Sequence, residues 1–418
     1  MVGRFILSSI LVGIVTGIFI TVYSLLTKFL SLVLYFGDPM ESVSHLPVWY
    51  IYLVPLVSIL IVNFLISKDE AVKEYGVREI AEAVEQNRLF FGIKDLFLKI
   101  FASSLSIASG FAIGNEGPSA AIGAMIAQKI HNFLKLPKKL IKVSLSIGAS
   151  SGIAAIFVSP VTGIMFAIEN IAYEFVRSYA GYLILASVIS FSIAWHYLEP
   201  LIFSYSTGKF IEYRYVFATV VFIPVVTFFV YLYLALKDKV LNFLNIKLFE
   251  RFSSYKNYIF GIIGALIIST IMLISPYAVF SGHEVVKLLI NDAAHLPLWL
   301  IFLIIILRII ATSVSLYANA VGGIFIALMS IGALVGYGFG EVMRVYFPIE
   351  PFYFAAIGAA VFVGVNMRLP LTAVVLALEI TYDYNVIIPT GISVVIVTYL
   401  ASLNFSLRKI TLRPRVEG

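Results

Sequence analysis

Long apolar stretches recur along the chain and are separated by short polar segments. The longest are Phe5–Leu26, Val48–Ile66, Val216–Leu236, Tyr258–Ile274, Leu298–Ile310 and Val386–Leu403. A helix needs about 20 apolar residues to cross a bilayer, and shorter helices are tolerated where they end inside the protein. Several stretches are shorter than this and are interrupted by Gly, Pro or Asn, as in transporters with broken helices. The pattern predicts an all-α polytopic membrane protein.

Composition supports this prediction and excludes several other classes. Hydrophobic residues make up 61% of the chain and charged residues 12%, whereas soluble domains carry about 25% charged residues. Cysteine is absent, which excludes disulfides and thiolate metal sites. The five histidines are scattered without ligand spacing, so we expect no metal and no cofactor. The first apolar stretch is long for a signal peptide and lacks a small-residue cleavage site, so we interpret it as a retained helix.

The net charge of +6 reflects topology rather than binding to nucleic acid. Basic residues cluster at Lys135–Lys142, Lys237–Arg251 and Arg408–Arg415, whereas the loops Gly37–Pro47 and Pro348–Phe352 carry acidic residues. Because basic loops stay on the cytoplasmic side, we expect both termini to be cytoplasmic. We expect residues 1–418 to form a single membrane domain in the cell membrane, with no appended soluble domain.

The most informative short motif is Gly114-Asn115-Glu116-Gly117-Pro118. An ionisable group at membrane depth is costly and usually faces a cavity or an ion path. The flanking glycines allow close backbone approach, and Pro118 suits the first turn of a helix. A helix that begins here would direct free N–H groups towards the surroundings of Glu116, which favours an anion. A carboxylate neutralised by a buried partner is the alternative.

An internal repeat relates the two halves of the chain. Gly148, Pro160 and Glu169 match Gly358, Pro370 and Glu379 at one constant offset (370 − 160 = 210), without a gap over the matched stretch. Matched Gly, Pro, Thr and Glu residues favour duplication over chance similarity between apolar helices. We therefore expect two structural repeats, roughly residues 1–205 and 206–418, because duplicated halves with broken helices commonly build substrate sites near the membrane midplane.

Four segments together resemble the CLC family of chloride channels and proton–chloride antiporters. In chain order they are Gly114–Pro118, Gly152–Glu169, Gly322–Phe325 and Arg368–Thr381. The resemblance covers essentially the whole chain and is that of a divergent, prokaryotic-type member without cytoplasmic regulatory domains. It implies an inverted repeat of tilted and broken helices, a homodimer, and one pathway per subunit for an inorganic anion such as chloride or fluoride.

The resemblance also implies roles for individual residues. Glu116 matches the gating glutamate, whose carboxylate competes with the anion for the outer binding position. Ile324 and Phe325 match residues whose backbone N–H groups face the central anion. A second filter loop of the family falls at Glu74–Arg78. The candidate anion-binding residues are thus Tyr75, Gly76, Asn115, Gly117, Ile324 and Phe325.

The filter departs from the family pattern at several positions. Tyr75 stands in place of the anion-binding serine, and it either replaces the hydroxyl donor or plugs the pore with its ring. Asn115 stands in place of an arginine, and Arg78 either restores that charge or points outward to the membrane surface. Ala327 replaces a proline. Near the C-terminus, Arg408 lies where the family often has a tyrosine.

The inner proton relay of family antiporters is also altered. Asn170 occupies the position of its glutamate, and an amide does not exchange protons near neutral pH. Glu169 is one residue away, which on an α-helix turns it by about 100°. Because Glu379 is its repeat partner, we interpret Glu169 as structural, and we list Arg78, Glu169, Asn170 and Arg408 as possible pathway residues.

These observations favour passive, channel-like anion flux gated by Glu116 without tight proton coupling. A proton-coupled chloride or fluoride antiporter is the alternative. A third possibility, from another class, is a non-conducting sensor or scaffold on a CLC fold. The sequence Gly148-Ala149-Ser150-Ser151-Gly152 fits a hydrolase nucleophile motif, but that motif needs a preceding strand. Small-residue helix packing explains it better, so we do not expect an enzyme.

Overall fold

The computed structural model describes residues 2–69, 72, 92–172, 176–203, 213–244, 256–292 and 296–402. Regular structure in these ranges is helical, apart from one isolated antiparallel bridge. Tyr75, Gly76, Arg78 and Arg408 lie outside the described residues. The predictions made for those four residues therefore remain predictions.

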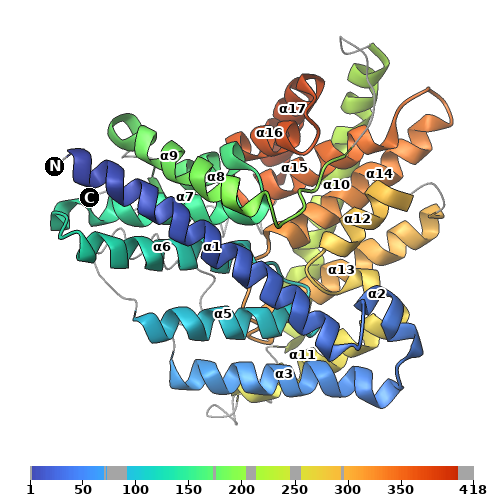
Figure 1. Ribbon diagram of the computed structural model, residues 1–418. Helices are drawn as coiled ribbons and strands as arrows, with labels where there is room; N and C mark the ends of the chain where they lie inside the picture. Colours follow the sequence, from blue (N-terminus) through green and yellow to red (C-terminus); the bar gives the residue numbers. More distant parts are fainter. Residues whose placement is uncertain are drawn as a thin grey trace. The chain divides into compact units, whose positions relative to one another are not determined.

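The helices, labelled as in Figure 1, are α1 (Val2–Leu34), α2 (Pro39–Ser42), α3 (Val48–Lys68), α5 (Ile93–Ala108), α6 (Glu116–Phe133), α7 (Ile141–Phe157), α8 (Pro160–Ala167), the π-helical turn η4 (Ile168–Ala172), α9 (Val176–Ala194), α10 (Tyr213–Leu244), α11 (Lys256–Ile274), α12 (His283–Asp292), α13 (Leu298–Tyr317), α14 (Phe325–Arg344), α15 (Pro351–Met367), α16 (Pro370–Glu379) and α17 (Ile387–Ser402).

Within the described ranges, eight helices are long and apolar enough to cross a membrane. Helix α1 has 33 residues, so it is about 50 Å long and exceeds the hydrocarbon thickness of about 30 Å. Such a helix accommodates the mismatch by tilting. Its outward positions carry large apolar side chains, among them Ile18, Val22 and Phe29. The prediction of an all-helical membrane protein is confirmed.

Several predicted spans ended too early. Helix α1 continues to Leu34, beyond Leu26, and α10 continues to Leu244, beyond Leu236.

The same is true of α13. The apolar pattern ended at Ile310, whereas α13 continues to Tyr317. The extension contains Thr312, Ser313 and Ser315, which interrupt the apolar run without breaking the helix. Ser315 donates its hydroxyl to the carbonyl of Ala311, one turn earlier, at 2.7 Å. Hydroxyls that bond to their own helix in this way are compatible with a buried helix. Ending the predicted span at the first polar residue therefore placed the end of α13 too early.

The chain forms two compact units, each assembled from separate stretches. The first comprises Met1–Leu201, Leu244–Val285 and Ala311–Ala327. The second comprises Ile202–Phe243, Val286–Ile310 and Leu328–Gly418.

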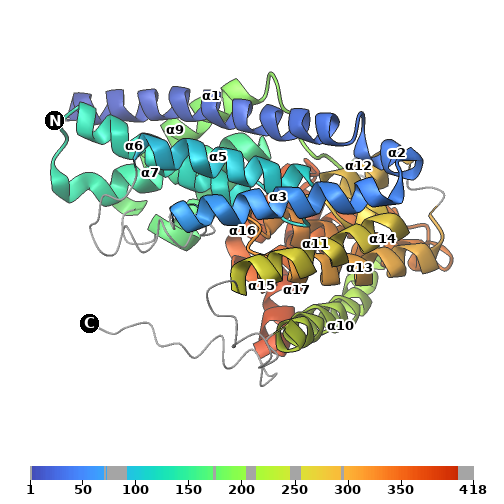
Figure 2. The same ribbon diagram turned by 90° about the horizontal axis from the view of Figure 1, so that it is seen from below.

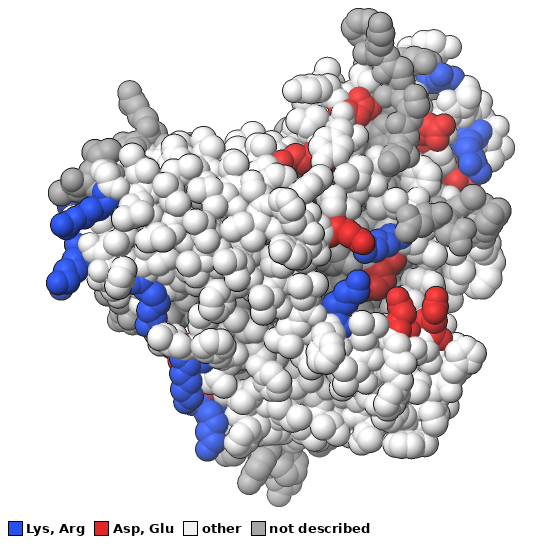
Figure 3. Space-filling model, viewed as in Figure 1, with Lys and Arg blue, Asp and Glu red and all other residues white. Residues whose placement is uncertain are grey.

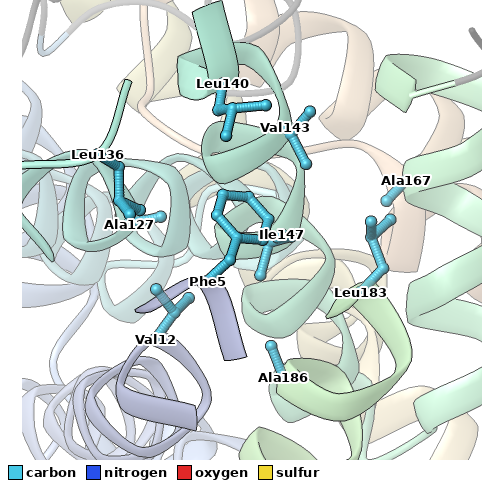
Figure 4. Packing of buried hydrophobic residues seen from close by; sticks show 10 residues of the cluster. All are labelled: Phe5, Val12, Ala127, Leu136, Leu140, Val143, Ile147, Ala167, Leu183 and Ala186. Atoms are coloured by element: carbon cyan, nitrogen blue, oxygen red, sulfur yellow. The ribbon is translucent and has the colours of Figure 1, made fainter. Parts of the chain in front are cut away.

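Helix α1 runs along several helices of the first unit. It packs on α5, α6, α7 and α9, while α3 packs on α5 and α11 (Figure 2). Figure 4 shows the core near the start of α1, where Phe5 and Val12 meet Ala127 of α6 and Ile147 of α7. Leu183 of α9 closes the other side of this cluster. The core thus fixes α6, the helix that begins at Glu116.

Small residues bring helices into backbone contact in each unit. Gly123 of α6 faces Gly148 of α7 so closely that an added Cβ on Gly148 would lie 2.6 Å from the Cβ of Ala127. In the second unit Gly332 of α14 faces Gly358 of α15 in the same way. The Gly148–Gly152 motif therefore lies inside a packed helix, as the packing interpretation predicted.

The repeated stretches share their local geometry. Helices α7 and α15 both end at a left-handed residue, Val158 (φ 53°) and Arg368 (φ 61°), 210 residues apart. The next amide, of Ser159 or Leu369, donates to a carbonyl five residues earlier. Pro160 and Pro370 then open α8 and α16. The same turn at the same offset is what duplicated sequence would produce.

Charged side chains are sparse on the exposed face of the first unit. Figure 3 shows a wide uncharged surface in the region of α1, with Lys and Arg near the end where α1 begins and both basic and acidic residues towards its other end. The connection between α6 and α7 at that end contains Lys135, Lys138 and Lys139. An apolar surface bounded by charged residues is the arrangement expected of a helix layer in contact with lipid.

Candidate functional site

Glu116 is the first residue of α6 and is buried, with 1% of its surface exposed. Neither carboxylate oxygen forms a hydrogen bond of good geometry with any described residue. Burial opposes the charged carboxylate, whereas the nearby backbone amides of Glu116 itself and of Ile326 favour it. These amides belong to the first turns of α6 and α14, where N–H groups lack partners within the helix. The carboxylate therefore occupies a place that suits an anion.

Two loops meet beside Glu116. Gly114 and Gly323 form an antiparallel bridge in which each amide donates to the other's carbonyl at 2.7 Å. The contact leaves no room for side chains, because a Cβ on Gly323 would lie 2.9 Å from the nitrogen of Gly117. The same Cβ would lie 3.2 Å from Oε2 of Glu116. The bridge thus holds the N-termini of α6 and α14 together.

The bridged loops follow helices that are also repeats of one another. The segment Lys99–Ser106 (KIFASSLS) matches Arg308–Ser315 (RIIATSVS) at an offset of 209 residues. At the same offset Gly110 (φ 107°) corresponds to Asn319 (φ 61°), and Gly114 corresponds to Gly323. The bridge therefore joins two equivalent residues, which is the contact that a local two-fold axis would generate.

Ile324 and Phe325 stand at the start of α14. Phe325 is buried, and its ring packs against Phe157 of α7 with centroids 4.4 Å apart and against Phe166 of α8 at 6.1 Å. Helix α14 begins at Phe325, so the amides of Phe325 and Ile326 lie in its first turn, where N–H groups lack carbonyl partners within the helix. Packing of the ring fixes the direction in which these groups point.

Asn115 and Gly117 flank Glu116 in the sequence. Asn115 is buried, makes no side-chain cap for α6, and leaves its Oδ1 without a hydrogen bond to any described residue. An amide at this position supplies a dipole but no net charge. The positive potential around the carboxylate therefore comes from helix N-termini rather than from residue 115.

Asn170 and Glu169 lie in η4, the π-helical turn that continues α8. The assumption of an α-helix through these two residues, and of a 100° turn between them, is therefore wrong. Asn170 Nδ2 donates to the carbonyl of Phe166 at 3.3 Å, which engages the amide with its own helix. The repeat partner α16 ends instead at Glu379. The two repeats therefore differ already at Ile168 and Glu169, the last residues of the matched stretch, so similar sequence there does not imply the same backbone.

Two buried cations were missed by sequence reasoning. Lys99 of α5 and Arg308 of α13 are both fully buried, and they are equivalent at the offset of 209. Arg308 Nε donates to Ser330 Oγ of α14 at 2.5 Å. Each stands 17 residues before the helix that forms the site, since α6 begins at Glu116 and α14 at Phe325. Searching for a second repeat at a neighbouring offset would have found them.

Broken apolar helices, with two helix N-termini meeting beside a buried carboxylate, define a membrane transport protein of the channel and transporter type. The family model described as "Voltage gated chloride channel" matches residues 53–402. The chain belongs to this family, the CLC family, and is an integral membrane protein of CLC-type anion transport.

Named relatives and solved structures agree with this assignment. The chain is 28% identical over 345 residues to the H(+)/Cl(-) exchange transporter ClcA of Salmonella paratyphi B and of Salmonella newport, covering 78% of this chain and 70% of each relative. A slow cyanobacterial Cl−/H+ antiporter has a TM-score of 0.83 at 20% identity, over 98% of this chain and 99% of the other. A CLC-type fluoride/proton antiporter has a TM-score of 0.78 at 18% identity, over 96% and 95%. These two structures share the fold.

Proposed function

We propose that this protein moves a small inorganic anion across the membrane through the junction of α6 and α14, and that Glu116 gates the flux. The observation that carries the proposal is the buried carboxylate of Glu116 beside the first amides of both helices, without a hydrogen bond to the described residues. A carboxylate and a chloride ion need the same N–H donors. They therefore compete for one place.

The competition gives the gate a simple chemistry. When Glu116 is charged, its carboxylate occupies the position between the helix N-termini and excludes the anion. When Glu116 is protonated, its attraction to these amides falls and the anion can enter. Anion flux therefore rises as the pH falls. Backbone donors stabilise a charge without selecting one anion, so the side chains around them decide selectivity.

We propose passive flux without tight proton coupling from the residue at position 170. Asn170 donates to the carbonyl of Phe166, and its amide does not titrate near neutral pH. This supports passive flux without tight proton coupling. The second candidate is proton-coupled exchange of chloride or fluoride. It is favoured by the printed descriptions of the Salmonella relatives and of both solved structures as exchangers or antiporters.

Further proposals rest on the family and on the charge pattern. We propose a homodimer with one pathway in each subunit and a single membrane domain built from repeats of about 1–205 and 206–418. We place the protein in the plasma membrane with both termini in the cytoplasm, because the basic loops cluster in the manner of cytoplasmic ones. The anion partner is chloride or fluoride.

Reconstitution tests the proposed function. Purified protein in liposomes is loaded with chloride, fluoride or nitrate, and efflux is recorded with and without a pH gradient. We expect efflux of at least one anion well above that of protein-free liposomes. Absence of efflux for every anion at both acidic and neutral pH would favour a non-conducting sensor or scaffold.

A further inference from the structure

Two buried serines link the equivalent loops at the site. Ser106 of α5 and Ser315 of α13 are fully buried and correspond to each other at the offset of 209. Ser106 Oγ accepts a hydrogen bond from the amide of Val321 at 3.1 Å. Ser315 Oγ accepts one from the amide of Ala112 at 2.8 Å. Each serine thus reaches the loop that follows its partner's helix.

The two contacts are reciprocal. Ala112 and Val321 are themselves equivalent at the offset of 209, and each lies two residues before the bridged glycine of its loop. The serine contacts and the Gly114–Gly323 bridge therefore hold the two loops together at two positions, two residues apart in each loop. We call the pair of Ser106 and Ser315, with the amides that they accept from, the serine clamp.

Each hydroxyl is held in one orientation. Ser106 donates to the carbonyl of Ala102 at 2.8 Å, and Ser315 donates to that of Ala311 at 2.7 Å. With its proton committed to its own helix, the oxygen presents lone pairs to the opposite loop. Loss of the hydroxyl would leave a buried amide without a partner, which is the expensive outcome in a dry interior. The loop would then shift to satisfy that amide.

A shift of either loop is transmitted to the site. Gly114 is two residues before Glu116, and Gly323 is two residues before Phe325. These residues are the first of α6 and α14. The spacing of the two helix N-termini, which sets how well their amides surround one anion, therefore depends on the loops that the serine clamp fixes.

We propose that Ser106 and Ser315 are positioning residues that set the spacing of the two helix N-termini and thereby the anion preference of the site. The proposal rests on the proposed function of the α6–α14 junction. Because the two serines are equivalent, replacing either one has a similar effect. The proposal needs no contact between either serine and the anion.

The test uses the full-length protein in liposomes and compares alanine and threonine at both positions. We expect Ser106→Ala and Ser315→Ala each to weaken the apparent affinity for chloride by about tenfold, since each leaves a buried amide unpaired. The ratio of chloride to fluoride flux should change with it. The variants Ser106→Thr and Ser315→Thr retain the hydroxyl and should stay within about twofold of the parent.

A matched control removes a buried hydroxyl that, among the residues the structure describes, bonds within its own helix. Ser151 is fully buried and donates to the carbonyl of Ile147 in its own helix at 2.8 Å. Ser151→Ala should leave affinity and the flux ratio unchanged. Hydrogen exchange gives a second readout: the amides of Ala112 and Val321 should exchange faster in the alanine variants and not in the Ser151 control. Where an alanine variant fails to fold, the cysteine variant, a weaker acceptor, should change affinity in the same direction.

The outcomes separate the two proposals. Normal flux by the parent, with affinity, flux ratio and exchange unchanged in both alanine variants, overturns the serine clamp and leaves the proposed function standing. Threonine variants as impaired as the alanine variants also overturn it, because the effect would then come from packing. Absence of anion flux in the parent overturns the proposed function, and with it the role of the serines in anion preference.

Discussion

Gly114 and Gly323 exchange two backbone hydrogen bonds of 2.7 Å, and each occupies the position of the other in its repeat. The bridge places the starts of α6 and α14 side by side, so that one backbone amide from each helix lies near the Glu116 carboxylate. One duplicated segment has thereby supplied both halves of an electropositive junction. The two helices differ at their first residue: Glu116 begins α6, and Phe325 begins α14.

The first prediction concerns the space around the carboxylate. A Cβ on Gly114 would lie 2.7 Å from Oε1 of Glu116 and would also crowd Ile326. Gly114→Ala should therefore push the carboxylate away from the helix N-termini, raise anion flux at neutral pH and flatten its dependence on pH. Liposome efflux from pH 5 to 8 measures this, with Gly181→Ala as the control because that glycine faces open space. A profile identical to that of the parent would show that the carboxylate does not gate from this position.

The second prediction concerns stability. Gly148→Ala would place a Cβ 2.6 Å from the Cβ of Ala127, against the backbone of Gly123. Overpacking of this kind costs about 1–3 kcal/mol. Gly181→Ala, in α9, gains helix propensity of about 0.5–1 kcal/mol without a clash. Thermal unfolding in detergent should show a lower midpoint for the first variant and an equal or higher one for the second. Equal midpoints would mean that the α6–α7 contact accommodates the added methyl group without loss of stability.

The third prediction concerns proton coupling. A chloride gradient should move little or no proton in liposomes, because Asn170 does not titrate near neutral pH. Asn170→Glu should introduce proton movement. Asn366→Glu serves as its control, since Asn366 also donates its amide to the carbonyl four residues earlier, that of Phe362, at 2.7 Å. Stoichiometric uphill proton pumping by the parent, abolished in Glu116→Gln, would instead establish an exchanger with a relay elsewhere.

The fourth prediction concerns Tyr75, which lies outside the described residues. Tyr75→Ser should shift the anion preference towards chloride or nitrate. Tyr75→Phe separates the two interpretations of this residue: loss of anion affinity indicates a hydroxyl donor, whereas behaviour like the parent indicates a ring in the pore. Selectivity and conductance that are indifferent to every change at 75 would rule out the alignment of this loop with the filter.

Sequence reasoning recovered the fold class, most spans and the residues at the start of α6 and α14. Long apolar stretches and the Gly-Pro start of α6 are local signals, whereas the start of α14 was inferred from the resemblance to the CLC family. Sequence reasoning did not recover the bridge between Gly114 and Gly323, because pairing across 209 residues leaves no local trace. The duplicated Lys99–Ser106 segment was readable in principle, but its offset differs by one residue from that of the helices after it. The π-helical turn at Asn170 has no propensity signal.

The most direct test of the account is the pH dependence of anion efflux in Glu116→Gln. Glutamine keeps the size of the side chain and mimics the protonated gate, so flux should be high at every pH and nearly independent of it. The parent should show flux that rises as the pH falls. Glu41→Gln, which removes an exposed carboxylate, should behave like the parent. Efflux in Glu116→Gln that keeps the full pH dependence of the parent would contradict the assignment of Glu116 as the gate.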